Sequence, residues 1–504
     1  MLERTEIDGL FPADLPAVDH WESRYPRRAL PEGAFVTRFC PSPTGPMHIG
    51  GIYTAIIGRD IAENSGGVYF VRIEDTDKAR EVPGAVDQFD RAFEYFGVAP
   101  TEPAGGPYGP YTQSARSQIY LSHVRELLRQ DKAYLCFATP EELSEMARQQ
   151  RSAKIPTGYY GTWAKWRGAP VEAVREALGR GLPYVVRYRS TAGPEDRISF
   201  TDRIRGDLEF AANQNDVVIL KRSDAEPPLP TYHFAHVVDD HLMRVSLVIR
   251  GDEWLSSTPV HLQLFDALGL DRIDYAHVAP LLKQEGSSKR KLSKRKDPEA
   301  SVDFYLQRGY PPAAVAYYLR GLVNGRLAEV PLDQALGARI DLAECNVSGA
   351  LVDMAKLESI SADHIADLPA AAIFSAVHDW ASGHDEELAG VMAAERDLAV
   401  RALKVERDGV PNPRKDLRKW SDFRDVYGYF FPQFFTPVTG LANDAYGGVD
   451  PAVIRAFVTE FCKEYQHLPE GDRWFDQIRE AAHRHGFART RAELKAAPEP
   501  GSTA

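Results

Sequence analysis

The hydrophobic pattern of the first hundred residues predicts a strand, a helix and a second strand in that order. Phe35–Phe39 reads as a strand, and Val68–Ile73 is apolar at nearly every position, as in a parallel strand buried on both faces. Between them, apolar residues recur at helical spacing until Asn64–Gly67: Ile52, Ala55, Ile56 and Ala62. A second helix is expected between Pro83 and Gly97. This order predicts an α/β fold.

The pattern loosens beyond residue 110 and then returns to strands. A helix is predicted at Val171–Gly179, followed by a strand at Tyr184–Tyr188. Buried-strand runs then recur: Val217–Leu220, Val245–Ile249 and His277–Leu282. A doubly wound sheet interrupted by an inserted subdomain accounts for this order. Beyond about residue 300 the spacing of apolar positions is helical.

Length and charge narrow the class of protein. The 504 residues predict about three domains. The formal net charge of −12 argues against a general polyanion or membrane-surface binder, so any contact with nucleic acid would be local. No signal-peptide pattern and no long apolar run occurs, which predicts a cytoplasmic protein without a membrane span. The four widely spaced cysteines exclude a disulfide framework and a CxxC-type zinc site, so no zinc and no structural metal is expected.

The first segment with chemical potential is the proline-rich loop and helix start at Phe39–Gly51. It follows the carboxyl end of a predicted strand, where open α/β sheets bind ligands, and a helix N-terminus offers free N–H groups to phosphate. Gly50 and Gly51 would let a base or phosphate approach the backbone, and His48 could donate to a phosphate oxygen. The alternative is a proline-rich turn followed by a capped helix.

The second segment is Lys289–Lys296, in which six of eight residues are basic. A loop of this charge can close over a triphosphate, with Lys291 and Lys294 stabilising the departing pyrophosphate. Ser293 lies between the lysines. The alternative is a solvated basic run or a nucleic-acid patch.

Together the two segments resemble the paired His-x-Gly-His and Lys-x-Ser-Lys signatures of class I aminoacyl-tRNA synthetases, which form one ATP site on a Rossmann fold. Further motifs resemble those of bacterial-type glutamyl-tRNA synthetases, in the family's order and spacing: Arg38–Gly45, Arg72–Asp77, Pro230–His233, Val237–Leu242, Ile249–Trp254 and Lys291–Arg295. The resemblance runs from about residue 34 to about 495 and is dense through about 325.

The resemblance implies ATP-dependent activation of L-glutamate to glutamyl-adenylate, in the presence of tRNA, and its transfer to the 3′-terminal adenosine of tRNA(Glu). The implied glutamate-binding residues are Arg38, Ser42, Glu74, Tyr232 and Arg250, with Arg250 on the side-chain carboxylate and Glu74 on the α-ammonium. The implied ATP-binding residues are His48, Gly50, Gly51, Lys291, Ser293 and Lys294, of which His48, Lys291 and Lys294 are the catalytic candidates. Mg²⁺ is expected as the counterion of ATP. For each charged residue alone, a structural ion pair is the alternative.

The resemblance also divides the chain. It implies a class I Rossmann-type catalytic domain with an inserted acceptor-stem-binding subdomain, followed by an all-helical anticodon-binding region, in a monomer. The predicted boundaries are an N-terminal extension at 1–33, Rossmann halves at 34–110 and 216–300, the insertion at 111–215, a stem-contact region at 301–350 and the helical region at 351–504. Arg414, Lys415, Arg418 and Lys419 are predicted to bind tRNA phosphates, with an amphipathic, solvated helix as the alternative.

Three departures from the family's pattern matter. His236 and Cys40 stand where other residues are usual, and Cys40 would place an oxidisable thiol near the substrate. The sequence stops where family members usually continue, which predicts weak selection between anticodons. The rivals are a catalytically idle paralogue that binds tRNA or a partner protein, a shorter glutamyl-queuosine type enzyme and a glutaminyl-tRNA synthetase. The long helical region disfavours the second, and Gly51 with Ser42-Pro-Thr44 disfavours the third.

Overall fold

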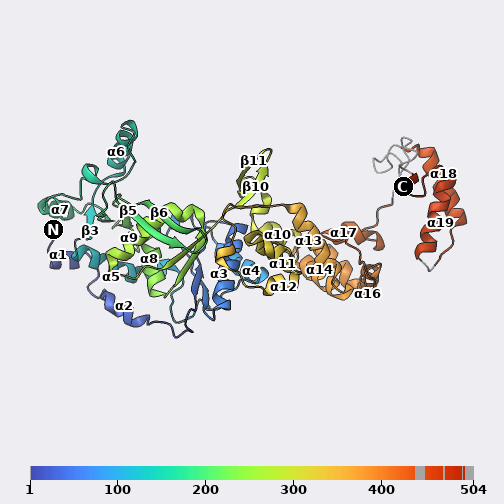
Figure 1. The fold of residues 1–504 in the computed structure, drawn as a ribbon, viewed down its shortest axis with the longest axis horizontal. Coiled ribbons are helices and arrows are strands. Elements are labelled where there is room, and N and C mark those ends of the chain that lie inside the picture. Colours follow the sequence, from blue (N-terminus) through green and yellow to red (C-terminus); the bar gives the residue numbers. More distant parts are fainter. Residues whose placement is uncertain (1, 438–448, 469–470, 491, 494–504) are drawn as a thin grey trace. The chain divides into compact units, whose positions relative to one another are not determined.

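The computed structural model describes residues 2–437, 449–468, 471–490 and 492–493 of the chain (Figure 1). The chain divides into two compact units, Met1–Val426 and Tyr427–Ala504. The first unit holds the sheets and most of the helices. Within the described residues, no helix is both long enough and apolar enough to span a bilayer.

A parallel sheet lies at the centre of the first unit. Strand β1 (Val36–Phe39) pairs with β2 (Val68–Val71), and β8 (Leu247–Gly251) pairs with β9 (Asp274–Val278), both in parallel. The two pairs adjoin at Ser246, whose N–H donates to the Val36 carbonyl at 3.0 Å. The carboxyl ends of these strands therefore share one edge, where a doubly wound sheet binds ligands.

Two cores cover the faces of this sheet. Side chains alternate along the strands, so that Tyr69 and Ile249 belong to one core whereas Phe70 and Val248 belong to the other. The first core holds α3 (Ile49–Asn64) and α4 (Ala85–Tyr95), and the second holds α5 (Ser117–Arg129), α8 (Tyr232–Leu242) and α9 (Thr258–Leu268). Burial on both faces explains why these strands are apolar at nearly every position. The predicted α/β class is confirmed.

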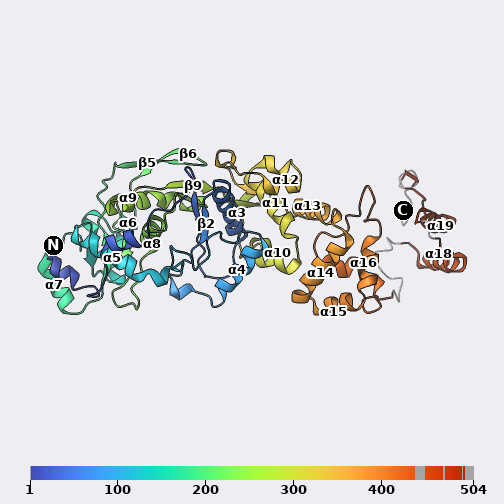
Figure 2. The ribbon, with the colours of Figure 1, turned by 90° about the horizontal axis from the view of Figure 1, so that it is seen from below.

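The strand pairing within the predicted insertion crosses its boundary at residue 215. Three strands form an antiparallel sheet in the order β3, β4, β7: β3 (Ala133–Cys136), β4 (Val185–Tyr188) and β7 (Val218–Leu220). By contrast, β5 (Arg197–Asp202) and β6 (Gly206–Ala211) form a hairpin that joins the central sheet, because Asp202 pairs in parallel with Tyr275 of β9 (Figure 2). Besides α5, this region contains the helices α6 (Pro140–Ser152) and α7 (Val171–Gly179).

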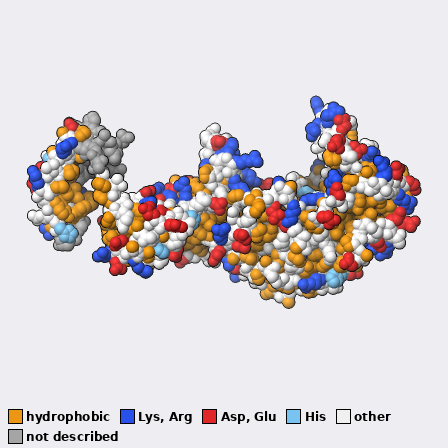
Figure 3. All heavy atoms as spheres, turned by 180° about the vertical axis from the view of Figure 1, so that it is seen from behind, with side chains coloured by type: hydrophobic (Ala, Val, Ile, Leu, Met, Phe, Trp, Pro, Cys, Tyr) orange, Lys and Arg blue, Asp and Glu red, His pale blue; other side chains and the backbone are white. Residues whose placement is uncertain are grey.

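The single strand predicted at 277–282 is two strands. Pro280, which has no N–H to donate, separates β9 from β10 (Leu281–Glu285). Strand β10 forms a hairpin with β11 (Ser288–Lys291) and pairs in parallel with β12 (Ala350–Leu351). The hairpin projects from the unit, and Lys and Arg side chains gather on it (Figure 3).

The region beyond residue 300 is helical, as predicted. In the first unit it comprises α10 (Val302–Arg308), α11 (Pro312–Val323), α12 (Leu332–Gly337), α13 (Met354–Ala366), α14 (Ala370–His384), α15 (Glu386–Ala394) and α16 (Arg396–Lys404). Helix α17 (Asp422–Tyr427) follows, and the second unit holds α18 (Pro451–Glu464) and α19 (Gly471–Arg484). Short 3₁₀ turns include Gln113–Arg116, Asp252–Ser257 and Pro298–Ala300.

The N-terminal extension lies over the first unit. It contains α1 (Arg4–Asp8) and α2 (Val18–Arg24). Trp21 Nε1 donates to Ser122 Oγ on α5 at 2.9 Å, and the Arg28 guanidinium donates to both carboxylate oxygens of Glu102. The extension is thus packed against the body of the unit.

Candidate active site

The two signature segments meet at the start of α3. His48 is the N-cap residue of this helix, and its Nδ1 accepts from the Gly50 N–H at 2.9 Å. Its Nε2 lies 3.2 Å from the Leu292 carbonyl, so Nε2 carries the proton and the imidazole is neutral. Burial lowers the pKa of His48, in agreement with this state. Lys294 Nζ donates to the Pro46 carbonyl at 2.5 Å. Segments about 240 residues apart in sequence therefore form one site.

Gly50 and Gly51 both lie close to neighbouring side chains. A Cβ on Gly50 would lie 3.0 Å from His48 Nδ1, and one on Gly51 would lie 3.1 Å from the Phe39 ring. Both contacts are tighter than most Cβ atoms make, so a side chain at either position would require His48 or Phe39 to shift by a few tenths of an ångström. Contact of either glycine with ATP stays a prediction.

The basic loop is held by a buried carboxylate. Asp297 accepts from both Arg290 Nη atoms, at 2.6 and 2.7 Å, and from the Ser293 N–H at 2.9 Å. Arg290 holds the pKa of Asp297 well below its usual range. Lys291 pairs with Glu253 at 3.0 Å, and both side chains are about half exposed. The hydrogen bonds to Asp297 thus hold the loop in place, while the side chains of Lys291 and Lys294 remain accessible from solvent.

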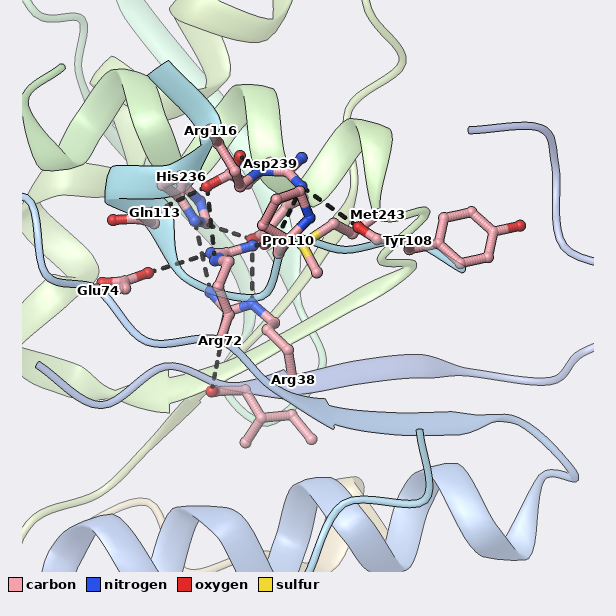
Figure 4. A network of polar contacts seen from close by, with 12 residues as sticks. Arg38, Arg72, Glu74, Tyr108, Pro110, Gln113, Arg116, His236, Asp239 and Met243 are labelled. Atoms are coloured by element: carbon pink, nitrogen blue, oxygen red, sulfur yellow. Dashed lines mark hydrogen bonds and ion pairs between the residues drawn. The ribbon is translucent and has the colours of Figure 1, made fainter. Parts of the chain in front are cut away.

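A buried network of charges lies at the carboxyl ends of β1 and β2 (Figure 4). Asp240 accepts from Arg38 Nε at 3.1 Å and from Arg72 Nη1 at 2.5 Å, and Arg72 Nη2 donates to Glu74 at 3.1 Å. Burial alone would raise the pKa of Asp240, yet Arg38 and Arg72 hold it well below its usual range. Asp239 pairs with Arg116 at 2.6 Å beside this network. Arg38 therefore forms a structural ion pair with Asp240, in addition to its predicted role in binding glutamate.

Glu74 is the carboxylate of this network that is least compensated. It is 8% exposed, and burial raises its pKa although Arg72 and Arg38 oppose the shift. Its hydrogen-bond donor Arg72 is shared with Asp240. A buried carboxylate with a raised pKa gains from a further cation, which suits an ammonium group.

Arg250 is surrounded by neutral acceptors. It is the penultimate residue of β8, is 6% exposed, and donates through Nε to His277 Nε2 at 3.0 Å and through Nη2 to Thr258 Oγ1 at 2.9 Å. Its Nη1 lies 3.2 Å from His261 Nδ1. Burial and the neighbouring cation keep the pKa of both imidazoles lowered. Within the described part of the chain, no carboxylate forms an ion pair with Arg250. The buried positive charge of Arg250 is therefore uncompensated, and an anionic ligand would stabilise it.

Aromatic side chains connect Arg250 with the charge network. Tyr232 packs against Trp254, with ring centroids 4.4 Å apart, and stacks on His236 at 5.9 Å. Burial raises the pKa of Tyr232, and Glu74, Arg250 and Arg38 all act on its hydroxyl electrostatically. The phenol is therefore neutral and can donate to an anionic ligand.

Other predicted residues have different surroundings. Ser42 is exposed, and its carbonyl accepts from the Thr44 N–H. The thiol of Cys40 is not activated, because burial raises its pKa to about 12, so the expectation of an easily oxidised thiol is not supported. His236 is buried, with Nδ1 2.9 Å from Asp240.

The basic cluster at 414–419 is not helical. These residues lie between α16 and α17 without regular structure, so the alternative of an amphipathic helix is wrong; Pro411 and Pro413 cannot donate the helical hydrogen bonds. Each cation pairs with a carboxylate: Arg414 with Asp416, Lys415 with Asp363, Arg418 with Glu358 and Lys419 with Asp422. Lys419 is 8% exposed, which leaves it little surface for a partner.

Sequence reasoning missed several residues of the site. Arg72 and Asp240 lie inside the family motifs, but no role was assigned to them from the sequence. A pattern of charged residues beside a predicted buried strand was a signal that could have identified them. His261, His277 and Asp202, the partner of His277, lie outside those motifs, and nothing local marked them. Among the described residues, no group of three or more His, Cys, Asp or Glu side chains could hold a metal ion.

Comparison with known proteins agrees with this geometry. Residues 34–358 match the family model described as tRNA synthetases class I (E and Q), catalytic domain. The glutamate–tRNA ligase of Clostridium beijerinckii is 40% identical over 95% of this chain and 88% of its own length. That of Sorangium cellulosum is 37% identical over 95% of this chain and 89% of its own length. The crystal structure of a glutamate tRNA ligase from Elizabethkingia meningosepticum, in complex with its amino acid, superimposes with a TM-score of 0.70 at 28% identity, covering 90% of this chain and 89% of that one.

Proposed function

Because this chain belongs to the class I tRNA synthetases (E and Q), we propose that it is a glutamate–tRNA ligase. It activates L-glutamate with ATP and transfers the glutamyl group to the 3′-terminal adenosine of tRNA(Glu). The relatives that cover nearly the whole chain carry this activity in their names, and the residues of the family's signatures are present and assembled in one place. The catalytically idle alternative has no observation in its favour.

The observation that carries the proposal is the state of Arg250. A buried guanidinium that contacts only neutral acceptors is costly until an anion joins it. The side-chain carboxylate of glutamate supplies that anion with a geometry the planar guanidinium can match in two hydrogen bonds. The amide of glutamine supplies no charge, so binding glutamine would leave the positive charge uncompensated. Arg250 therefore favours glutamate over glutamine.

The remaining residues divide between the substrates. Glu74 binds the α-ammonium, whose charge the buried carboxylate needs. Tyr232 and Arg38, which interact electrostatically with each other, are assigned to glutamate as well, together with the exposed Ser42. His48, Lys291, Ser293 and Lys294 receive ATP, which brings Mg²⁺ as its counterion.

The chemistry takes place in two steps in this one site. An α-carboxylate oxygen of glutamate attacks the α-phosphorus of ATP, the bond to the β-phosphate breaks, and pyrophosphate leaves toward Lys291 and Lys294. The terminal ribose hydroxyl of tRNA then attacks the activated carbonyl and AMP leaves. The protein contributes positioning and charge stabilisation and forms no covalent intermediate.

The tRNA is proposed to lie along the rest of the chain. We assign the acceptor stem to the insertion at 111–215, the inside corner of the tRNA to 301–350 and the anticodon to the helical region at 351–504. The exposed cations Lys415 and Arg418 are the members of the basic cluster best able to reach phosphates, whereas buried Lys419 supports the loop. Because the reaction serves translation, we place the protein in the cytoplasm.

The proposal is tested by charging a bulk bacterial tRNA pool with labelled glutamate, glutamine or aspartate in separate reactions. Glutamate is expected to be esterified to tRNA in an ATP-dependent manner, and glutamine and aspartate are not. Lys294→Ala serves as the matched control for a contaminating host enzyme, because it is purified in the same way and should charge slowly. Failure to charge with glutamate would favour the idle paralogue.

A further inference from the structure

Asp202 lies at the end of β5, on the hairpin that joins the edge of the central sheet, and it contacts the site through His277. We propose that Asp202 is a positioning residue for glutamate recognition: it selects the tautomer of His277 that holds Arg250 in place. This inference rests on the proposed function, because it concerns the same pocket. It assigns a role to a residue that no signature motif contains.

The contacts of Asp202 fix its carboxylate on all sides. Oδ1 accepts from the N–H groups of Ile204 and Arg205, at 3.0 and 2.9 Å. Oδ2 accepts from the N–H of His277 at 3.1 Å and lies 2.6 Å from His277 Nδ1. Asp202 is 1% exposed, and His277 is fully buried. The carboxylate cannot rotate without losing several hydrogen bonds in a place that water does not reach.

This arrangement determines which nitrogen of His277 carries the proton. A carboxylate only accepts, so His277 Nδ1 is protonated and donates to Asp202. Burial, with the charge of Arg250, keeps the pKa of His277 lowered although Asp202 opposes the shift. The ring is therefore neutral, and Nε2 keeps the lone pair that accepts from Arg250 Nε at 3.0 Å.

The hydrogen bond at Nε sets the plane of the guanidinium. Thr258 and His261 of α9 accept from the two terminal nitrogens of Arg250, and His277 of β9 accepts at Nε, so three acceptors on two elements define the plane. The guanidinium carbon lies 4.7 Å from the centroid of the Tyr275 ring, over its face. Paired recognition of a carboxylate depends on this plane, because both hydrogen bonds must be parallel. Loss of the Nε bond would let the plane turn.

Asp202→Asn tests the tautomer directly. If the amide oxygen keeps the bonds to Ile204 and Arg205, the amide nitrogen faces His277 Nδ1 and donates to it. The imidazole must then carry its proton on Nε2, which points a donor at the Nε–H of Arg250. We expect the KM for glutamate in tRNA charging to rise about tenfold or more, as for a lost buried hydrogen bond to a charged group. The KM for ATP should stay within about twofold.

The matched control is Asp207→Asn on the same hairpin. Asp207 is exposed and accepts from Thr201 at 2.7 Å, so the same chemical change is made without touching His277. It is expected to leave both KM values unchanged. If Asp202→Asn lowers the thermal midpoint but leaves the KM for glutamate equal to that of this control, Asp202 only supports the turn at 203–205 and the inference is overturned.

Two substitutions at His277 test the same hydrogen bond to Arg250 without changing Asp202, which supports the turn at 203–205. His277→Gln places an amide oxygen where Nε2 lies and can still accept from Arg250, whereas His277→Phe keeps the ring and removes the acceptor. We expect His277→Phe to raise the KM for glutamate as Asp202→Asn does, and His277→Gln to raise it much less. In the His277→Gln background, Asp202→Asn should add no further rise. Equal effects of Gln and Phe, or additive effects of the pair, would overturn the inference.

The failure of this inference can be told from failure of the proposed function. A wild-type protein that does not charge tRNA with glutamate refutes the function. The nitrogen chemical shifts of His277, assigned by their loss in His277→Gln, report the tautomer without any substrate. Protonation at Nδ1 in the wild type and at Nε2 in Asp202→Asn is expected. Unchanged shifts in an enzyme that charges glutamate would overturn the inference alone.

Discussion

Replacing Arg250 by alanine is expected to weaken glutamate binding far more than ATP binding. The side chain is 6% exposed, so its contact with a substrate carboxylate is shielded from water. Deleting one partner of such a charge pair costs roughly 2–5 kcal/mol, which corresponds to a rise in the KM for glutamate from about 30-fold to several thousand-fold. The proposed ATP-binding residues His48 and Lys294 form hydrogen bonds with the backbone carbonyls of Leu292 and Pro46 and do not contact Arg250. The KM for ATP should therefore change little.

The assay is initial-rate charging of tRNA, with glutamate varied at saturating ATP and ATP varied at saturating glutamate. Arg250→Lys is the matched variant, because it keeps the charge and loses the planar fork that meets His261, His277 and Thr258. It should fall between the wild type and Arg250→Ala. An unchanged KM for glutamate in Arg250→Ala would refute the placement of the side-chain carboxylate at this residue.

Three further predictions concern neighbouring groups. Lys294→Ala should slow adenylate formation with little change in the KM for glutamate; single-turnover rates equal to those of the wild type would contradict this. Because burial raises the pKa of Glu74, acidification should neutralise it above the ordinary range of a glutamate carboxyl, and the KM for glutamate should then rise; Glu74→Gln should have a high KM without this pH dependence. Asp240→Asn removes the buried counter-charge of Arg38 and the shortest ion pair of Arg72, which keeps Glu74 and Asp239, and should lower the free energy of unfolding in urea by about 3–5 kcal/mol; a loss below about 1 kcal/mol would show that these remaining partners suffice.

The sequence predicts the local elements well because their signals are local. The strands at β1 and β2 and the helix α3 follow from apolar runs and spacing that burial on both faces of a sheet imposes. The hairpin β5–β6 escaped prediction as part of the central sheet, because nothing in its own pattern names β9 as its partner. Pairing between distant strands is decided by tertiary packing, which a single sequence does not display.

The site divides in the same way. Residues inside motifs, such as His48, Glu74 and Arg250, are predicted to belong to the site because their spacing matches a known pattern. Asp202 and His277 could not be predicted from the sequence, because neither belongs to a recognisable motif. Their proposed role follows from the 2.6 Å contact between them, which the sequence does not display. The basic cluster that includes Arg414 shows the converse, because its charges are visible in sequence whereas its paired carboxylates are visible only in the fold.

Exchange of labelled pyrophosphate into ATP, measured with glutamate or glutamine and with or without tRNA, tests the central claim most directly. If the site activates glutamate as proposed, exchange should require glutamate and tRNA together, and glutamine should not replace glutamate. Exchange driven by glutamine, or its absence with glutamate and tRNA both present, would contradict the account.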